Sequence, residues 1–390
     1  MAPMIRTEAF APARHIPPPN SPAKRRSTGQ QPAFHGRSSA VLPRPCGRQE
    51  PRTATGMRNL DKHFASVVLA AALLLPGFVQ PAGAQDVLPS WNDTSSKTRI
   101  VDFVKATVTE GGEGYVAPDD RIAVFDNDGT LWSEQPYYIQ LGFALDRVKT
   151  LAPQHPEWQA KAPFKSILEG KLKEAAEGGE MGIVDVILAT HSGMTTDQFN
   201  TIVSDWFETA RHPKTGKLYK QMTYLPMREL LDYLRANDFT TYIVSGGGVE
   251  FMRAISEDLY GIPPQYVVGS TISTEFAIVG DVPVLKRLPK VDFINDGAGK
   301  PAGINKFIGR KPIFVAGNSD GDYEMARWTT AAKGPGFAMI VHHTDGNREY
   351  AYDRQSPVGK LDKALDEASR RNWLVVDMQK DWRRIFVFEP

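Results

Sequence analysis

The amino-acid sequence predicts an α/β fold, a doubly wound parallel sheet with a smaller helical cap domain inserted into it. Short apolar runs typical of buried strands occur at 121–126, 240–244 and 312–316. Segments with helical spacing separate the later runs, and strands that alternate with helices form parallel sheets covered on both faces. Residues 133–219 show helical spacing without any such apolar run. This stretch is therefore expected to be a helical insertion after the first strand.

The other elements follow from local patterns along the chain. An amphipathic helix is expected after Ser95-Ser96, because apolar side chains recur there at helical spacing, and it should end at the glycines of 111–114. Proline and glycine divide the insertion into helices near 137–151, 163–177, 180–190 and 195–210. The elements expected after it are a helix at 226–237, the strand at 240–244, a helix at 249–259, a strand at 266–268, a hairpin at 272–294 with its turn near Gly280-Asp281, a helix at 301–309, the strand at 312–316, a helix at 322–331, a strand at 337–342 and a helix at 359–371.

The first 84 residues are not expected to belong to the folded domain. Residues 1–56 are rich in Pro, Arg and Ser and lack apolar periodicity, which predicts a disordered leader. Residues 57–84 show the order of basic, apolar and small side chains typical of a secretory signal peptide, with cleavage near Ala84. Because a signal peptide normally begins a chain, Met57 is the expected start, and an organelle transit peptide is the alternative.

The signal peptide also bears on location and on domain organisation. Its apolar part is about a dozen residues long, which is short for crossing a bilayer. We therefore expect a periplasmic or secreted protein without a stable membrane anchor, and an uncleaved anchor is the alternative. The rest of the chain is expected to divide into a first part of the core at 85–132, the cap at 133–222 and the remainder of the core at 223–390.

The charge of the chain argues against nucleic acid as a partner. The whole chain has 46 Lys and Arg against 45 Asp and Glu, a formal net charge of +1. Residues 1–84 hold eleven of the basic residues and three of the acidic ones, so the remainder carries −7. A modestly acidic domain lacks the basic surface that a phosphate backbone requires. The only cysteine, Cys46, lies in the leader, so the mature chain can form no disulfide.

Two carboxylates directly follow the first strand, in the stretch Asp126-Asn127-Asp128-Gly129-Thr130. Gly129 permits a tight turn, so the two carboxylates can point in different directions at the edge of the sheet. One can then attack an electrophile while the other transfers a proton. The alternative interpretation is an Asp-Gly turn that merely closes a strand.

Polar residues also follow the second apolar run, and ligands bind at the carboxyl ends of parallel strands. Ser245 offers a hydroxyl there, and the glycines that begin with Gly246 offer exposed backbone N–H groups at a helix start. Both features suit a bound anion, so Ser245 and Gly246 form a predicted phosphate site. The alternative, that Ser245 only caps the next helix, stays open.

A lysine is expected at the same edge of the sheet. The helix that leads into the strand at 312–316 should start at this edge and run away from it. Pro301 suits the first turn of that helix, which places Lys300 at the edge. Lys306 lies more than a turn further on and is expected to be a solvated helix residue.

The third strand end adds oxygen ligands for a metal. Asn318 and Asp322 follow it, and oxygen ligands with few carboxylates favour Mg²⁺. The predicted metal ligands are Asp126, Asp128, Asn318 and Asp322. No motif of His or Cys indicates zinc, and His342-His343 are expected to be surface or loop residues rather than ligands.

These residues together resemble a known family. Asp126-Asn-Asp-Gly-Thr, Ser245, Lys300 and Gly-Asn-Ser-Asp-Gly-Asp at 317–322 are similar to the four ordered motifs of the haloacid dehalogenase (HAD) superfamily. The resemblance is closest to its phosphoserine-phosphatase-like hydrolases, which carry a helical cap between the first two motifs. It covers about 118–345, and the first motif is highly specific. The second and third motifs are each a single residue, and their order and placement at strand ends support them.

The resemblance implies a Mg²⁺-dependent phosphomonoesterase that acts on a small phosphorylated metabolite. Asp126 would attack the phosphorus and form an aspartyl-phosphate. Asp128 would protonate the leaving alkoxide and later deprotonate the attacking water. Ser245 and Lys300 would hold phosphate oxygens, and Mg²⁺ would bind Asp126, the Asp128 carbonyl and the side chain at 318. The second Asp also argues against dehalogenation, because family members with that activity lack it.

The chain departs from the family pattern at one position. The family usually has Asp where this chain has Asn318, and a neutral ligand weakens a cation site. Asp322 or Asp320 could compensate, and Asp322 is expected to be either a ligand or a partner of Lys300.

Other functions stay open on the sequence alone. A phosphotransferase would use the same residues, and a non-catalytic metabolite-binding protein would use the same fold. The substrate is also open, because the cap determines it. Trp132, Glu134, Tyr137 and Tyr138 closely follow the nucleophile and are expected either to line the pocket or to pack at the hinge.

Overall fold

The computed structural model describes residues 86–177, 179–331 and 333–389. The sequence-based interpretations of 1–56 as a leader and of 57–84 as a signal peptide lie outside these residues. Within the described part of the chain, no helix has both the length and the apolar character that crossing a membrane requires.

A seven-stranded, mostly parallel sheet forms the centre of the fold, as the sequence predicts. The strand order is β4-β3-β2-β1-β5-β6-β7, and every neighbouring pair is parallel except β3 and β4. All four residues of β1 are buried, as expected for a central parallel strand. The strands are β1 (Ile122–Phe125), β2 (Thr240–Gly248), β3 (Val267–Val279), β4 (Val282–Phe293), β5 (Phe314–Gly317), β6 (Phe337–His342) and β7 (Leu374–Asp377).

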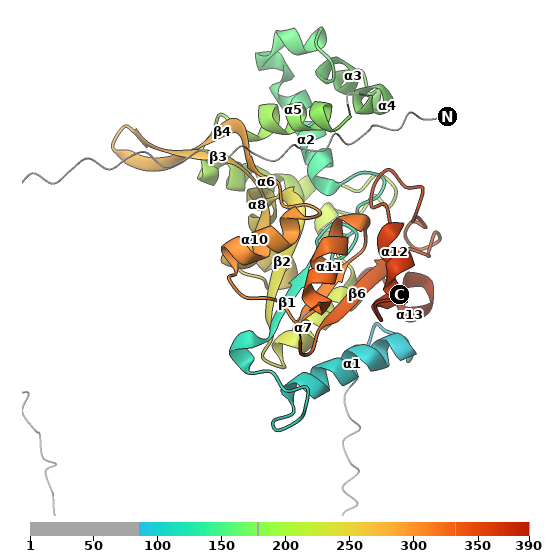
Figure 1. The fold of residues 1–390 in the computed structure, drawn as a ribbon. Coiled ribbons are helices and arrows are strands. Elements are labelled where there is room, and N and C mark those ends of the chain that lie inside the picture. The colour runs from blue at the N-terminus through green and yellow to red at the C-terminus, as the bar shows by residue number, and fades with distance from the viewer. Residues whose placement is uncertain (1–85, 178, 332, 390) are drawn as a thin grey trace, which may run out of the picture. The chain divides into compact units, whose positions relative to one another are not determined.

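Helices cover both faces of this sheet, so the fold is doubly wound. Side chains alternate along β1, and Ala123 and Phe125 pack in one hydrophobic cluster while Ile122 and Val124 pack in another. The first cluster includes side chains of α1 (Ser95–Val108), α7 (Leu225–Arg235), α8 (Val249–Arg253), α9 (Ser256–Tyr260) and α13 (Met378–Asp381). The second includes side chains of α10 (Gly299–Phe307), α11 (Tyr323–Thr330) and α12 (Lys363–Ala368), of which α10 and α11 lie in front of the sheet in Figure 1.

The helical insertion lies between β1 and β2 in the chain. It contains α2 (Ile139–Leu151), α3 (Phe164–Leu168), α4 (Leu172–Ala176), α5 (Gly179–His191) and α6 (Thr196–Thr209). Helices α2, α3 and α5 share a small hydrophobic cluster of their own around Trp158. Helix α6 instead packs on the main core, where Phe207 stacks on Trp132 with ring centroids 5.9 Å apart. Figure 1 shows α3, α4 and α5 at the top, beyond the ends of the central strands.

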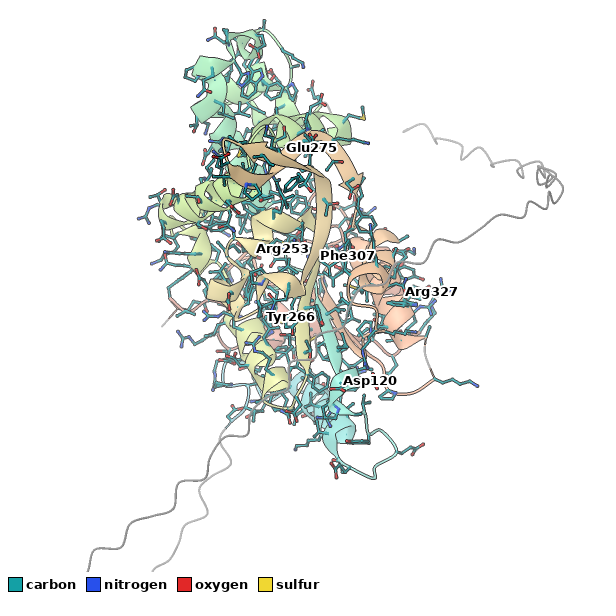
Figure 2. The ribbon with its side chains drawn as sticks, turned by 90° about the vertical axis from the view of Figure 1, so that its left-hand side faces the viewer. Asp120, Arg253, Tyr266, Glu275, Phe307 and Arg327 are labelled. Carbon is teal, nitrogen blue, oxygen red and sulfur yellow. The ribbon has the colours of Figure 1, made fainter. Side chains whose placement is uncertain are left out.

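The β3–β4 hairpin forms an arm that connects the sheet with the insertion. Its two strands pair from Thr271 with Phe293 at one end to Val279 with Val282 at the other, and Gly280 takes a φ of 63° at the turn. The N–H of Arg287 in β4 donates to the Met194 carbonyl, and the N–H of Gly193 donates to the Arg287 carbonyl. Figure 2 shows Glu275 of this arm at the end of the molecule where the insertion lies, and Asp120 at the opposite end.

Some short elements differ from the sequence-based expectations. The helix expected at 163–177 is two helices, α3 and α4, because the chain turns at Gly170, whose φ is 74°. The helix expected at 249–259 is likewise divided into α8 and α9, and α12 is shorter than the expected 359–371. Strand β7 and helix α13 were not expected, because a four-residue element carries too little periodicity to be recognised.

Candidate active site

The carboxyl ends of three neighbouring strands form the edge of the sheet where the predicted site residues lie. Phe125 at the end of β1 is aligned with Ile243 in β2 and with Ala316 in β5. The N–H of Asp126 still donates to the Ala316 carbonyl at 2.9 Å, so the loop leaves β1 only after this residue. Side chains that follow these strands are therefore brought together, although they are far apart in the sequence.

A buried lysine lies between two carboxylates at this edge. Nζ of Lys300 donates to Oδ1 of Asp126 at 2.7 Å and to Oδ1 of Asp322 at 2.6 Å. Lys300 is only 1% exposed, whereas Lys306 of the same helix is exposed. Helix α10 begins at Gly299, two residues before the expected start, so Lys300 lies in its first turn. Although burial disfavours the ammonium, Asp126 and Asp322 together raise the pKa of Lys300.

Asp322 also holds the loop that follows β5. Its second carboxylate oxygen accepts hydrogen bonds from the N–H groups of Asn318 at 3.0 Å and Ser319 at 3.1 Å. These are the contacts of a partner of Lys300, the second of the two roles that the sequence left open for Asp322. The carboxylate of Asp320 points elsewhere, because Oδ1 accepts from the N–H groups of Asp362 and Ala364 at the start of α12.

The two carboxylates of the first motif have different surroundings. Burial, followed by the nearby charge of Asp322, raises the pKa of Asp126 to about 8, while Lys300 acts in the opposite direction. Burial raises the pKa of Asp128 to about 6, and a hydrogen bond at 2.9 Å from the Trp132 indole limits that rise. No described residue donates a hydrogen bond to the second oxygen of Asp126. The pair thus combines one acidic side chain that is bonded to the Lys300 ammonium with one whose hydrogen-bond donor is the neutral Trp132 indole.

Ser245 is part of β2 and not the cap of the following helix. Strand β2 continues to Gly248, and α8 begins only after that residue, so the capping alternative is wrong. Oγ of Ser245 accepts a hydrogen bond from the N–H of Gly247 at 3.1 Å. A Cβ added at Gly247 would lie 3.5 Å from this hydroxyl and 3.7 Å from a carboxylate oxygen of Asp128. Glycine at 247 therefore leaves open the space that Ser245 and Asp128 share, and the neighbouring Gly246 is exposed at its edge.

Glu134 is a buried residue of the site. The sequence left open whether it lines the pocket or packs at the hinge. Its Oε1 accepts hydrogen bonds from Nδ2 of Asn318 at 2.6 Å and from the hydroxyl of Tyr352 at 2.8 Å. Burial and the charge of Asp128 raise the pKa of Glu134 well above its usual range. The sequence placed Glu134 near the nucleophile, but it gave no sign that Asn318 is its partner.

Of the two expected places for His342 and His343, surface or loop, the loop is the one that His343 occupies, because it follows β6 and is only 2% exposed. Its Nε2 lies 2.8 Å from the Gly129 carbonyl, and its Nδ1 lies 3.3 Å from Oε2 of Glu349. The ring also stacks on Tyr352 with centroids 4.3 Å apart. His343 therefore contacts the turn of the first motif through the Gly129 carbonyl. Nothing in the sequence predicts a contact between residues this far apart.

Gln140, which the sequence analysis did not single out, links the insertion to the glycine loop. Its Oε1 accepts a hydrogen bond from the N–H of Gly248 at 2.8 Å. Its Nε2 lies 3.2 Å from Nε2 of His191, a buried residue at the end of α5. Since Gln140 belongs to the first turn of α2, the insertion contacts the predicted phosphate site directly.

The oxygen atoms at this edge suit a hard cation. Among the residues that the structure describes, no group of three or more His, Cys, Asp and Glu side chains is arranged to hold a metal ion. Mg²⁺ needs fewer side chains, because it keeps several waters and binds through one or two carboxylates. This edge has several acidic side chains and one ammonium, that of Lys300. The atoms of the predicted ligands that could bind a metal ion are oxygens. This donor set fits a hard cation such as Mg²⁺, Ca²⁺ or Mn²⁺.

Comparison with known proteins gives structural matches and no match among curated proteins. A conserved protein of unknown function from Anaerococcus prevotii is 18% identical, with 66% of this chain and 88% of that chain covered and a TM-score of 0.45. A HAD family hydrolase from Salmonella enterica serovar Typhi is 17% identical, with coverages of 57% and 62% and a TM-score of 0.31. A phosphoserine phosphohydrolase-like protein from Francisella tularensis is 16% identical, with coverages of 58% and 89% and a TM-score of 0.29.

The match to a protein family is more informative than these structural likenesses. The family model of haloacid dehalogenase-like hydrolases matches residues 123–327, more than half of the chain. The matched region contains both carboxylates of the first motif, the serine, the buried lysine and the loop after β5. The chain therefore belongs to the haloacid dehalogenase-like hydrolases.

Proposed function

We propose that the protein is a Mg²⁺-dependent phosphomonoesterase that hydrolyses a small phosphorylated metabolite through an aspartyl-phosphate. One observation carries this proposal. The Lys300 ammonium lies between Asp126 and Asp322, while Asp128 faces the adjoining space next to Ser245. A nucleophile, a proton carrier and a cation for phosphate oxygens are thus within reach of one ester, as phosphoryl transfer requires.

In the first step a carboxylate oxygen of Asp126 attacks the phosphorus of the ester. The P–O bond to the leaving alcohol breaks, and the proton of Asp128 moves to the leaving oxygen. A pKa of about 6 allows Asp128 to hold this proton in a useful fraction of molecules near neutral pH. The products of this step are the free alcohol and a phosphoryl group bound to Asp126.

In the second step water attacks the phosphorus of the aspartyl-phosphate. Asp128, now ionised, takes a proton from this water, and the bond between phosphorus and Asp126 breaks to release inorganic phosphate. Lys300 and the Ser245 hydroxyl hold phosphate oxygens through both steps. Mg²⁺ would be held by the Asp126 carboxylate, the Asp128 backbone carbonyl and the Asn318 side chain, and it would supply positive charge to the phosphoryl oxygens.

The direct test is hydrolysis of p-nitrophenyl phosphate by the full chain, with and without Mg²⁺. We expect turnover that depends on Mg²⁺ and falls by about three orders of magnitude or more in Asp126→Asn. The control is Asp381→Asn, because Asp381 is also a buried carboxylate but hydrogen bonds to Thr94 and Ser96. An Asp126→Asn variant with normal turnover would contradict the proposal.

A second variant separates the roles of the two carboxylates. Asp128→Asn should slow hydrolysis by about 10²–10⁴-fold for esters whose alcohol must be protonated as it leaves. The loss should be smaller for p-nitrophenyl phosphate, whose leaving group needs little protonation. Equal losses for both kinds of ester would show that Asp128 is not the acid.

Two alternatives use the same assay. Transfer of the phosphoryl group to added glycerol in preference to water would indicate a phosphotransferase. Tight binding of phosphorylated metabolites without turnover would indicate a non-catalytic binding protein on this fold. The intact pair Asp126 and Asp128 favours the hydrolase, because a binding protein needs no proton carrier.

We also propose that the protein acts in the periplasm or outside the cell, without a stable membrane anchor. The order of basic, apolar and small residues at 57–84 supports this location. The mature protein should begin just after Ala84, which N-terminal sequencing of the exported protein would test. Accumulation of the uncleaved chain in the cytoplasm would contradict it.

A further inference from the structure

A buried glutamate lies beside the neutral amide at position 318. Glu134 is 2% exposed and Asn318 is 1% exposed, and Nδ2 of Asn318 donates to Oε1 of Glu134 at 2.6 Å. The other donor to Oε1 is the hydroxyl of Tyr352. Both donors are neutral, so no cation among the described residues is bonded to the Glu134 carboxyl. A buried charge in this situation is costly unless a cation joins it.

Two glycines leave room for this carboxylate. A Cβ added at Gly129 would overlap the Asn318 amide and Oε1 of Glu134, and one added at Gly359 would overlap Oε1 of Glu134 as well. Both glycines have positive φ, 71° and 64°, so the backbone at each position also favours glycine. The loop after β1 and the loop before α12 thus shape one space around Glu134.

The other acidic residues of the loop after β5 are not free to replace an absent carboxylate. Asp322 uses one oxygen for Lys300 and the other for backbone N–H groups. Asp320 accepts hydrogen bonds from the backbone at the start of α12. Glu134 is therefore the acidic group that contacts the side chain of Asn318 among the described residues, whereas Asp322 contacts its backbone N–H.

Charge at the site points the same way. Asp126 and Glu134 are both buried acidic residues at this edge of the sheet. The ammonium closest to these groups, Lys300, is bonded to Asp126 and Asp322 rather than to Glu134. The Glu134 carboxyl and the Asn318 amide thus offer oxygen atoms next to each other, and oxygen atoms are the ligands that a hard divalent cation prefers.

We propose that Glu134 supplies the negative charge of the divalent-cation site formed with Asp126 and Asn318, in place of the carboxylate that Asn318 lacks. This inference rests on the proposed function, because it concerns the Mg²⁺ of that reaction. Asn318 contributes its amide oxygen, which also accepts a hydrogen bond from the Thr130 hydroxyl at 3.2 Å. This bond and the one from its Nδ2 to Glu134 fix the orientation of the amide. The carboxylate charge of the site thus comes from a residue that follows the nucleophile instead of from the loop after β5.

The test is Mg²⁺ binding to the full chain, measured by isothermal titration calorimetry without substrate. Glu134→Gln keeps an oxygen that can accept the Asn318 hydrogen bond but removes the charge. We expect this variant to bind Mg²⁺ about 10- to 100-fold more weakly. Asp381→Asn, which removes a buried carboxylate away from the site, should bind Mg²⁺ like the unaltered protein.

A double variant moves the charge to the other partner. Asn318→Asp in the Glu134→Gln background should restore most of the lost affinity, because the carboxylate and the amide have only exchanged places. If Glu134→Gln does not fold, Asn318→Asp alone serves as the test. It should place two carboxylates in contact, so it should bind Mg²⁺ more tightly and be less stable without it.

Several results would overturn the inference. These are an unchanged Mg²⁺ affinity in Glu134→Gln, a double variant as weak as the single one, or an Asn318→Asp protein with unchanged affinity and stability. Failure of the proposed function looks different. A protein that binds Mg²⁺ through Glu134 but hydrolyses no phosphate ester would refute the phosphatase and leave the site in place.

Discussion

The carboxylates at the active-site edge differ in what balances their charge. Asp126 and Asp322 share the Lys300 ammonium, and Asp128 has the Trp132 indole. Within the described part of the chain, Glu134 accepts hydrogen bonds from two neutral donors, the Asn318 amide and the Tyr352 hydroxyl. Since burial raises the pKa of Asp126, Asp128 and Glu134 alike, the protonation of these groups depends on the cations near them.

Replacement of Gly359 tests whether the space around Glu134 matters. Gly359→Ala adds a Cβ that overlaps Glu134, whereas no described residue lies within 4 Å of a Cβ at Gly309. Both glycines have positive φ, so each variant should lose about 1–2 kcal/mol from the backbone alone. Gly359→Ala should lose clearly more in urea denaturation and should also bind Mg²⁺ more weakly. Equal losses in both variants would show that Glu134 can move without consequence.

His191 should make the protein less stable in mild acid. Burial, and then the charges of Arg287 and Arg147, lower the pKa of His191 to about 3. The unfolded chain therefore binds a proton below about pH 6.5 that the folded protein rejects, and stability falls by up to about 1.4 kcal/mol per pH unit. His191→Gln should lose less stability than the unaltered protein between about pH 6.5 and pH 5. Parallel stability curves over this range would contradict the prediction.

Helix α10 positions the Lys300 ammonium between Asp126 and Asp322. Lys300 in its first turn is buried between two carboxylates, and Lys306 further along is exposed. Lys300→Met should destabilise the protein by about 3–5 kcal/mol, because it leaves two buried carboxylates unpaired. Lys306→Met is the matched control and should change stability by less than about 0.5 kcal/mol.

The loss in Lys300→Met should also depend on pH. Without the ammonium, which lowers the pKa of Asp126, the folded protein should hold a proton on Asp126 that the unfolded chain releases. Stability of the variant should then rise as the pH falls, and the deficit should be smaller at about pH 5 than at about pH 7.5. Urea denaturation at both values measures it. A deficit that is the same at both would show that the ammonium does not balance these carboxylates.

The sequence predicted elements best where a strand and its ending are both distinctive. The apolar run 122–125, followed by Asp126, Asp128 and Gly129, predicted β1 and the turn after it. Pro301 predicted the position of Lys300. Short elements without periodicity, such as β7, were missed. Helix ends within the insertion were also uncertain, because a single glycine such as Gly170 divides one apparent helix into two.

At the scale of the whole molecule, the parallel sheet explains why much of the site could be predicted. Parallel strands bring their carboxyl ends to one edge, so Asp126, Ser245 and Asn318 could be grouped from their positions after three strands. Contacts from other parts of the fold could not be predicted from the sequence. His343 and Glu134 reach the site through burial and hydrogen bonds that no local pattern encodes.

The central claim is that Asp126 forms a covalent bond to phosphorus. Borohydride added during turnover of p-nitrophenyl phosphate reduces an aspartyl-phosphate to homoserine, and peptide mass spectrometry locates the altered residue. We expect homoserine at position 126, formed only with substrate present and absent from Asp126→Asn. Rapid turnover without a modified residue at 126, or with the modification at another carboxylate, would contradict it.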